Sequence, residues 1–582
     1  MLRLENFIKK IYKGPKIVGF AFLLVIILIM TIGIPSWARF KNRVTLNNVV
    51  EWDGNVAESY RDGSGTVEDP YIISNGAELA YFSEQLLEND YENTYFKLSK
   101  DILLNRGLFK YDLNDGLMYI LDNEIYYVDP YTNKYYGNVE RTGEEVGTIN
   151  VLNSLDSFKG NFDGSSFTIH GLYVTDANKE ELALFTGLNG IVHDLYVENA
   201  VIYGGSYTAG IASNSENASL KNILFDGYVI GKNENVSKTI NVELDETTVP
   251  IKNEETVDYA FFKNKIPLIG GDVAYTTVTG EYELSGFIDE EVTIKVNGEE
   301  VTGGSFEVEL GSYLLNLVSF STYTDSSNEG SVTFKNLKYN IEYDYGIAGG
   351  VVGLANNIVL ENVVNKADVY SYSVSGGIVG VATDTVNIYN SYNEGKIVSE
   401  HVSAGLIGVI EKSDNPFIIE SSYNTGEISG IDVGGFFGIV SEALEPITIK
   451  NSFDASISDF CIGTIDYSYV QGDNVYYTNG DLVVNEGSVS GSFIKTTMEN
   501  LTSKDFLLNN LMFNEFSNFE DLENNPLNVW IFENNHLPIL FIDDIENPLA
   551  NIHVSRYTWN NFSNTLSNIK LDTNITFMIQ ET

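Results

Sequence analysis

The residues able to do chemistry are scattered along this 582-residue chain. No two histidines form the His-Glu-x-x-His helix that places two imidazoles around zinc. Gly63-Ser64-Gly65 matches a serine-hydrolase motif only in part and lacks the strand-to-helix turn that exposes the nucleophile. We therefore predict ordinary strand or loop positions for all five histidines, which are His170, His193, His401, His536 and His553.

Cysteine and calcium motifs are equally sparse. The single cysteine, Cys461, excludes an intrachain disulfide and a cysteine-based zinc cluster. Residues 112–116 contain part of an EF-hand loop but lack its spacing and its terminal Glu, so they predict a turn. The sequence thus predicts no metal site and no cofactor.

Paired carboxylates are the chemistry of polysaccharide hydrolases and lyases built on parallel β-helices. The chain has no Asp-x-Asp, and the pair Asp543-Asp544 follows the last expected repeat. Folding can still gather carboxylates, because 80 of the 81 acidic residues follow residue 43. A glycan-active enzyme therefore stays an alternative to a binding protein.

Aromatic side chains offer the clearest means of ligand contact. Residues 106–157 are rich in tyrosine, and exposed aromatics are large, rigid and amphipathic, which suits recognition of sugars or proteins. The same rings can instead pack this segment against the rest of the chain. The candidate ligand-binding residues are Tyr126, Tyr127, Tyr131, Tyr135 and Tyr136.

A repeat of nearly constant length organises the middle of the chain. The motif Gly-Gly-x-x-Gly, with Ala-Gly in one copy, ends in turn at Gly353, Gly380, Gly408 and Gly438. A second marker, Asn-Ser-aromatic-Asn or a close variant, keeps the same spacing. The repeat-structural residues are these four glycines together with Asn390 and Asn451.

The apolar runs within each repeat are short and β-branched, and none holds a helical period. Helical and leucine-rich arrays need signatures that are missing here. We therefore predict an all-β fold, a right-handed parallel β-helix, in which glycine stands where a Cβ atom would collide and Asn accepts left-handed corners.

The repeat pattern also divides the chain. It breaks after Gly231 and resumes at Gly346, and the intervening stretch alternates in the manner of antiparallel strands. We predict eight segments: a signal peptide or signal-anchor helix (1–43), an N-terminal entry or cap (44–105), a tyrosine-rich protrusion (106–157), β-helix coils (158–231), an inserted antiparallel β module (232–344), further coils (345–490), a C-terminal cap (491–545) and a short β element or tail (546–582).

The N-terminal segment predicts export. Lysines precede an apolar run over 17–34, which as a helix is long enough to span a bilayer as an anchor. Ser36 and Ala38 have the spacing that a signal peptidase accepts, so cleavage is the alternative. The expected location is the extracellular face of a bacterial membrane, or the medium.

Charge narrows the class of partner. The formal net charge is −47, although eight of the 34 Lys and Arg residues lie in the first 43 positions. An anionic body of this size repels the phosphate backbone, so nucleic acid is excluded as an expected partner. An extracellular glycan or protein is the expected ligand, with membrane contact through 17–34 if that run is uncleaved.

Several motifs resemble GLUG-motif bacterial cell-surface proteins. The resemblance covers roughly residues 50–540, apart from 106–157 and the insert, and implies a secreted or surface-attached β-helix. Such regions occur in adhesin-like proteins and upstream of catalytic domains. The motifs are Trp52-Asp53-Gly54, Asp69-Pro70-Tyr71-Ile72-Ile73, Glu78-Leu79-Ala80-Tyr81, Phe158-x-Gly-x-Phe-Asp-Gly164, the Gly-Gly-x-x-Gly elements, Leu501-Thr502-Ser503-Lys504-Asp505-Phe506, Trp530 and Leu537-Pro538-Ile539-Leu540.

We therefore predict a non-catalytic cell-surface or adhesion-type protein that displays its β-helix to host, matrix or glycan ligands. The alternatives are a polysaccharide-active β-helix enzyme and a passive surface spacer. Three or more carboxylates grouped with an Arg or Lys on one exposed face would favour the enzyme, whereas a face of aromatic residues and Asn without buried acidic residues would favour binding.

Overall fold

A computed structural model describes residues 49–543 of the chain, with short gaps. The predicted membrane segment 17–34 and the predicted C-terminal element 546–582 lie outside the described residues. No helix within the described part is both long and apolar enough to cross a membrane. The gaps are 177, 232–236, 244–245, 252–256, 262–272, 288–291, 297, 310–317, 325–329, 345, 412, 414, 442, 444, 466–467, 484–488, 518–521, 523–524 and 534.

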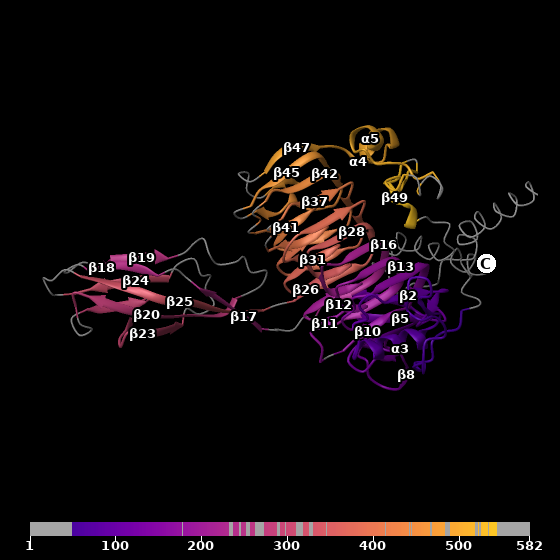
Figure 1. Cartoon of the computed structure of the whole chain (residues 1–582), viewed down its shortest axis with the longest axis horizontal. Helices are drawn as coiled ribbons and strands as arrows, with labels where there is room; N and C mark the ends of the chain where they lie inside the picture. Colours follow the sequence, from indigo (N-terminus) through magenta and orange to yellow (C-terminus); the bar gives the residue numbers. More distant parts are fainter. Residues whose placement is uncertain are drawn as a thin grey trace, which may run out of the picture.

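Strands dominate the described residues, which confirms the prediction of an all-β chain (Figure 1). Three parallel sheets form the main body, and the chain crosses them in turn. The largest has 18 strands: β1 Tyr71–Ile73, β2 Tyr95–Leu98, β3 Ile102–Leu103, β9 Asn161–His170, β10 Tyr173–Thr175, β13 Ile191–Tyr203, β16 Ser219–Ile230, β28 Ile358–Asn365, β29 Asp368–Ser371, β32 Val386–Tyr389, β33 Tyr392–Asn393, β34 Ile397–Ser399, β37 Phe417–Glu420, β38 Tyr423–Asn424, β39 Ile428–Ser429, β42 Ile447–Asp454, β45 Val470–Tyr477 and β47 Val489–Lys495.

The other two parallel sheets follow one another closely along each repeat. The six-stranded sheet contains β11 Glu181–Leu182, β14 Tyr207–Ala209, β26 Ile347–Gly349, β30 Val374–Gly376, β35 Val402–Ala404 and β40 Asp432–Gly434. The seven-stranded sheet contains β12 Phe185–Leu188, β15 Ala212–Glu216, β27 Val352–Asn356, β31 Val379–Ala382, β36 Ile407–Ile410, β41 Phe437–Val440 and β44 Thr464–Ile465.

Successive repeats pair in register. Val352 lies opposite Val379, which lies opposite Ile407, which lies opposite Phe437. Aliphatic and aromatic side chains of all three sheets fill one continuous core between them. The repeat spacing seen in the sequence is therefore the spacing of neighbouring parallel strands.

The repeat glycines lie where neighbouring backbones approach most closely. A Cβ atom on Gly380 would lie 2.6 Å from Ile347 Cγ2 and 2.7 Å from the carbonyl oxygen of Gly353. Gly353, Gly408 and Gly438 have similar contacts with the repeat before each of them. Only glycine fits this column without moving a strand.

A Gly380→Ala variant tests this account. Because the added methyl group meets backbone on a rigid strand, we expect a loss of roughly 1 to 3 kcal/mol and a lower melting temperature. Gly137→Ala is the matched control, since its Cβ would have no atom within 4 Å. Equal melting temperatures for the two variants would contradict the predicted collision.

The corner residues of the large sheet adopt the left-handed conformation. Asn390 has a φ of +47° and Asn451 has a φ of +46°, and the equivalent residue of the intervening repeat is Ser421, at +50°. Asn side chains also bond between repeats, as from Asn362 Nδ2 to Asn222 Oδ1 at 2.8 Å. Asn is among the few residues that visit this region readily.

A second row of amides lies inside the fold. Asn365 donates to Asn393, Asn393 to Asn424, and Asn424 to Asp454, over 2.7, 2.8 and 3.2 Å. All four side chains are buried. Burial raises the pKa of Asp454 to about 6, against hydrogen bonds from Ser456 and Asn424 that lower it.

The described residues between 237 and 344 form two antiparallel sheets that extend away from the parallel sheets (Figure 1). Leu220 in β16 pairs with Leu360 in β28, so the module is looped out between two adjacent repeats. Its strands are β17 Ser237–Glu243, β18 Thr247–Ile251, β20 Val273–Ser285, β23 Ser305–Glu309 and β25 Gly330–Asp344 in one sheet, and β19 Val257–Phe261, β21 Thr293–Val296, β22 Glu299–Val301 and β24 Val318–Tyr323 in the other.

Helix α3 (Gly76–Leu86) closes the N-terminal end of the core. The side chain of Asn75 caps it by accepting from the amide of Glu78. Its Phe82 stacks on Phe96 of β2 at 4.3 Å between centroids. The described part of the predicted entry segment, residues 49–105, thus contributes apolar side chains to the first repeat.

The C-terminal segment, made up of the described residues between 496 and 543, lies along the outer face of the large sheet. It contains α4 (Met498–Leu501), α5 (Lys504–Asn510), β48 (Trp530–Ile531), β49 (Ile539–Leu540) and the 3₁₀ helix η4 (Phe541–Asp543). Its apolar side chains cover a row of aromatic rings. The region predicted as a cap therefore reaches back beside the repeats, and η4 contacts β16.

That row consists of Tyr392, Tyr423 and Phe453. Their rings stack nearly in parallel, with centroids 4.6 and 4.5 Å apart. Trp530 packs against both tyrosines. The recurring aromatic of the repeat is thus a structural column.

Two further short strands pair near the end of the parallel sheets. They are β43 Phe460–Ile462 and β46 Asp481–Val483.

Candidate functional site

The tyrosine-rich segment folds into a sheet of its own and packs on the repeats. Its five antiparallel strands are β4 Leu108–Asp112, β5 Gly116–Leu121, β6 Glu124–Asp129, β7 Lys134–Tyr136 and β8 Glu145–Thr148. Phe109, Tyr119 and Val128 share a buried cluster with Tyr173 and Val201 of the large sheet. The segment predicted as a protrusion is therefore anchored along one of its faces.

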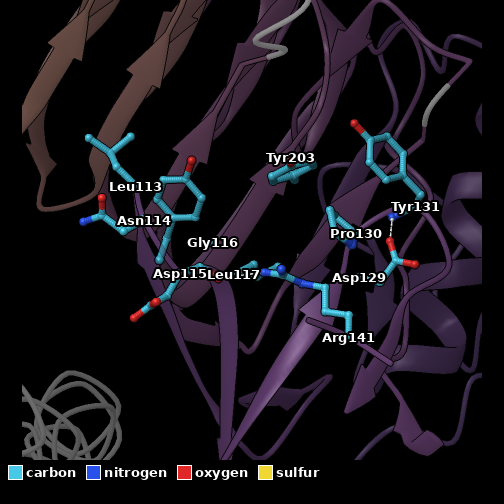
Figure 2. A pocket seen from close by; sticks show the side chains of 11 residues that line it. Leu113, Asn114, Asp115, Gly116, Leu117, Asp129, Pro130, Tyr131, Arg141 and Tyr203 are labelled. Carbon is cyan, nitrogen blue, oxygen red and sulfur yellow. Dashed lines mark hydrogen bonds between the residues drawn. The ribbon is translucent and has the colours of Figure 1, made fainter. Parts of the chain in front are cut away.

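A cavity of about 320 Å³ opens between this sheet and the repeats. The turn after β4 forms one wall, the turn after β6 forms the other, and Tyr203 of β13 lies between them (Figure 2). The lining residues are Tyr111, Leu113, Asn114, Asp115, Gly116, Leu117, Asp129, Pro130, Tyr131, Arg141 and Tyr203.

Side-chain hydrogen bonds within each turn fix both walls. Asp112 Oδ1 accepts from the amide of Asn114 at 2.8 Å, which holds the first turn. Asp129 accepts from the amide of Tyr131 at 3.0 Å and from the hydroxyl of Thr132 at 2.8 Å, which holds the second. The turn predicted for 112–116 is therefore part of the cavity wall.

Arg141 ties the two walls together. Its guanidinium donates to the carbonyls of Val128 and Asp115, each at 2.7 Å, and to that of Val139 at 3.2 Å. These bonds use most of its directional donors, so its main role is to hold the walls. The cavity is thus formed in advance of any ligand.

The aromatic surfaces of the cavity differ in exposure. Tyr131 is 62% exposed, the most exposed of the tyrosines among the large exposed hydrophobic side chains. Tyr111 instead lies against Tyr370 of the large sheet, with centroids 5.0 Å apart, and burial raises its pKa. The cavity is therefore lined by one exposed ring, that of Tyr131, and by the ring of Tyr111, which packs against the repeats.

The structure separates the five candidate tyrosines. Only Tyr131 lines the cavity. Tyr126 and Tyr135 pack against each other at 5.1 Å, and Tyr135 also meets the buried Tyr119. Tyr127 and Tyr136 are half-buried and lie opposite each other in neighbouring strands.

Sequence reasoning missed the other cavity residues. Tyr111 and Tyr203 are far apart in the sequence, and Arg141 carries no motif. The sequence contained a partial signal for one wall of the cavity, because the acidic and glycine residues of 112–116 predict a tight turn.

A second cluster lies on the large sheet, where β9 and β13 run side by side. Asp163 pairs with His193, and Asp194 follows at a left-handed corner with a φ of +53°. His193 Nδ1 lies 2.8 Å from Asp194 Oδ2 and 3.8 Å from Asp163 Oδ1. One ligand atom from each residue fits within 4.8 Å, the kind of group that can hold a metal ion.

Hydrogen bonds dominate the electrostatics of this cluster. The bond to Asp194 raises the pKa of His193 against the effect of burial. Burial raises the pKa of Asp194, but bonds from His193 and Asn222 outweigh it, so the pKa is lowered. The prediction of an ordinary strand position for His193 omitted the adjacent Asp194 and also Asp163, which only the strand register brings to it.

The other described histidines form no such group. His170 is buried with its Nδ1 3.6 Å from Glu198 Oε2. His536 is exposed beside Glu533. His401 lies against the ring of Tyr372, and His553 is outside the described residues.

Comparison with known proteins adds one likeness. No family model matches the chain. Over 185 residues it is 25% identical to Halomucin of Haloquadratum walsbyi (strain DSM 16790 / HBSQ001). The match covers 31% of this chain but 2% of that protein, so the chain spans a very small part of the length of the relative it matches. The likeness is compatible with a role at the cell surface.

Proposed function

We propose that the chain is a right-handed parallel β-helix of the GLUG-motif surface-protein type, and that it binds an extracellular glycan in the cavity beside Tyr131. The in-register parallel pairing of successive repeats supports the β-helix. The motifs quoted above support the family, and the likeness to Halomucin is compatible with a surface location.

The single observation that carries the binding role is a preformed cavity with an exposed ring. Sites for small ligands are concave, largely preformed, and combine apolar faces with a few placed polar groups. Here Tyr131 and Tyr111 supply aromatic surface, while Asn114 and Asp115 supply polar atoms at the rim. A sugar ring offers both an apolar face and hydroxyl groups to such a surface.

Charge favours an uncharged or amino-bearing sugar. The acidic residues Asp115 and Asp129 are among the lining residues, and the whole chain is strongly anionic. The cationic group of Arg141 is directed at backbone carbonyls. Acidic polysaccharides would therefore meet net repulsion.

A Tyr131→Ala variant of the full chain tests this role on an array of neutral, amino and acidic oligosaccharides. We expect the wild type to retain neutral or amino-bearing glycans, and the variant to bind them at least tenfold more weakly, about 1.4 kcal/mol. Tyr469→Ala is the control, because Tyr469 is an exposed tyrosine, 43% exposed, that does not line the cavity.

Other outcomes would reject the proposal. Shortened oligosaccharides in the same wells would favour a polysaccharide-active enzyme. Binding to no glycan or matrix protein would favour a spacer. Binding that Tyr131→Ala leaves intact would place the ligand elsewhere, with the module 237–344 as the next surface to test.

A further inference from the structure

The cluster of Asp163, His193 and Asp194 has a feature that a simple row of surface charges lacks. In each side chain, the outer polar atom, which points away from the other two side chains, has a partner of its own. That partner fixes the direction of the inner polar atom, which points toward the other two. Asn161 Oδ1 lies 3.1 Å from His193 Nε2, and Asn222 donates to Asp194 Oδ1 at 2.7 Å. Lys97 Nζ lies 3.2 Å from Asp163 Oδ2.

These outer partners leave three inner atoms facing one another, of which Asp163 Oδ1 also accepts from the amide of Ser165 at 2.6 Å. Asn161 Oδ1 can only accept, so Nε2 of His193 carries a proton, and Nδ1 is the ring nitrogen that is directed at the carboxylates. Nδ1 faces two carboxylate oxygens at 2.8 and 3.8 Å, a geometry that suits either a proton donated from Nδ1 to Asp194 or a metal ion in place of that proton. Partners of this kind accompany metal-binding histidine and carboxylate side chains.

The cluster is also reachable. The side chains of Asp163, His193 and Asp194 are 24, 27 and 34% exposed. Oxygen and nitrogen ligands of zinc lie about 2.0 to 2.2 Å from the ion. Because the three ligand atoms already lie within 4.8 Å of one another, they need to move little to surround it. A solvent molecule can complete the coordination on the exposed side.

We propose that Asp163, His193 and Asp194 bind a divalent transition-metal ion of the Zn²⁺ type on the outer face of the large sheet. One imidazole nitrogen with two carboxylate oxygens suits Zn²⁺, whereas Ca²⁺ and Mg²⁺ prefer oxygen alone. The ion joins β9 to β13, two strands of successive repeats. This site is separate from the glycan cavity and does not depend on the proposed binding role.

Zinc titration of the untagged full chain tests the site. A chromogenic chelator competes for Zn²⁺ in excess CaCl₂ and MgCl₂, which occupy the many exposed carboxylates. We expect one equivalent of Zn²⁺ to bind the wild type, and at least tenfold weaker binding by His193→Gln and by Asp194→Asn. Asn at 194 keeps the shape and the oxygen that accepts from Asn222.

Two controls keep the result decisive. His536→Gln removes an exposed histidine beside a carboxylate and should leave Zn²⁺ affinity unchanged. Co²⁺ added to the wild type reports coordination by its visible absorption, which needs no variant to fold. Absence of a stoichiometric Zn²⁺ site, or equal affinity in wild type and His193→Gln, would overturn the proposal and leave a protonated His193 between two carboxylates.

Discussion

An Asp543→Ala variant should release the C-terminal segment from the large sheet while leaving the repeats folded. Asp543 Oδ1 lies 2.6 Å from Lys366 Nζ, and its other oxygen accepts from the hydroxyl of Tyr392. Burial disfavours the charge of Lys366, but the carboxylates of Asp543 and Glu394 outweigh it and raise the pKa. Truncating Asp543 removes the carboxylate at 2.6 Å from a mostly buried ammonium and leaves that of Glu394 at 3.8 Å.

We expect a loss of roughly 2 to 4 kcal/mol in the free energy that holds this segment, since breaking a buried pair leaves an uncompensated charge. Hydrogen exchange is the direct measurement. Amides of η4, β48 and β49 should exchange faster, while those of β42 keep their protection, because local opening need not involve the whole chain.

A double variant, Lys366→Met with Asp543→Ala, separates charge from packing. Removing both charged groups should recover most of the protection, because an apolar side chain replaces the stranded ammonium. If the single variant exchanges like the wild type, Asp543 does not hold the segment. If the strands of the repeats lose protection equally, the segment and the repeats unfold as one unit.

Asp454→Asn should stabilise the protein above pH 6 and not below pH 4. The carboxyl of Asp454 ends the internal row of Asn365, Asn393 and Asn424, and burial raises its pKa from 3.8 to about 6. A carboxyl with a raised folded-state pKa contributes its full stability below the unfolded value, and that stability is lost as pH rises through about 6.

The size of the effect follows from the shift. About two pKa units correspond to about 3 kcal/mol between the neutral and ionised forms at neutral pH. An amide cannot ionise and continues the row, so Asp454→Asn should raise the free energy of unfolding, measured by urea titration at pH 8, by a matching amount. The two proteins should converge at pH 4.

Asp459→Asn is the matched control, because Asp459 is an exposed carboxylate close to Asp454 in the sequence. It should show no comparable rise at pH 8. If Asp454→Asn raises the free energy of unfolding by the same amount from pH 4 to pH 8, packing and not ionisation explains why the carboxyl is destabilising.

The repeats could be predicted because their physics is local and periodic. A glycine such as Gly380 and a corner residue such as Asn390 are each required by backbone geometry that recurs every repeat. The stacked ring of Tyr423 follows from the same spacing. The glycine motif and the Asn-Ser-aromatic-Asn motif recur with the same spacing. Together they therefore predict the strands, the corners and the stacked columns.

The sites could not be predicted, because they depend on contacts that the repeat does not encode. The cavity needs Tyr203 of β13 beside a sheet formed by a preceding segment. Asp163 meets His193 of the following repeat, where β9 and β13 are irregular and shift register next to the pair. The C-terminal segment carries no repeat marker, so nothing local shows that Asp543 reaches Lys366.

The looped-out position of residues 232–344 bears on how such chains can be altered. Ile230 lies opposite Tyr370, and Ile347 lies opposite Val374. Joining Gly231 directly to Tyr345 would leave three residues between Ile230 and Ile347, the same number as between Tyr370 and Val374. Lys221 and Glu361, which form an ion pair at 2.8 Å, already bridge the two sides of that junction. The junction is therefore a natural exchange point, at which a gene could gain, lose or replace a displayed module while the register of the strands on either side is preserved.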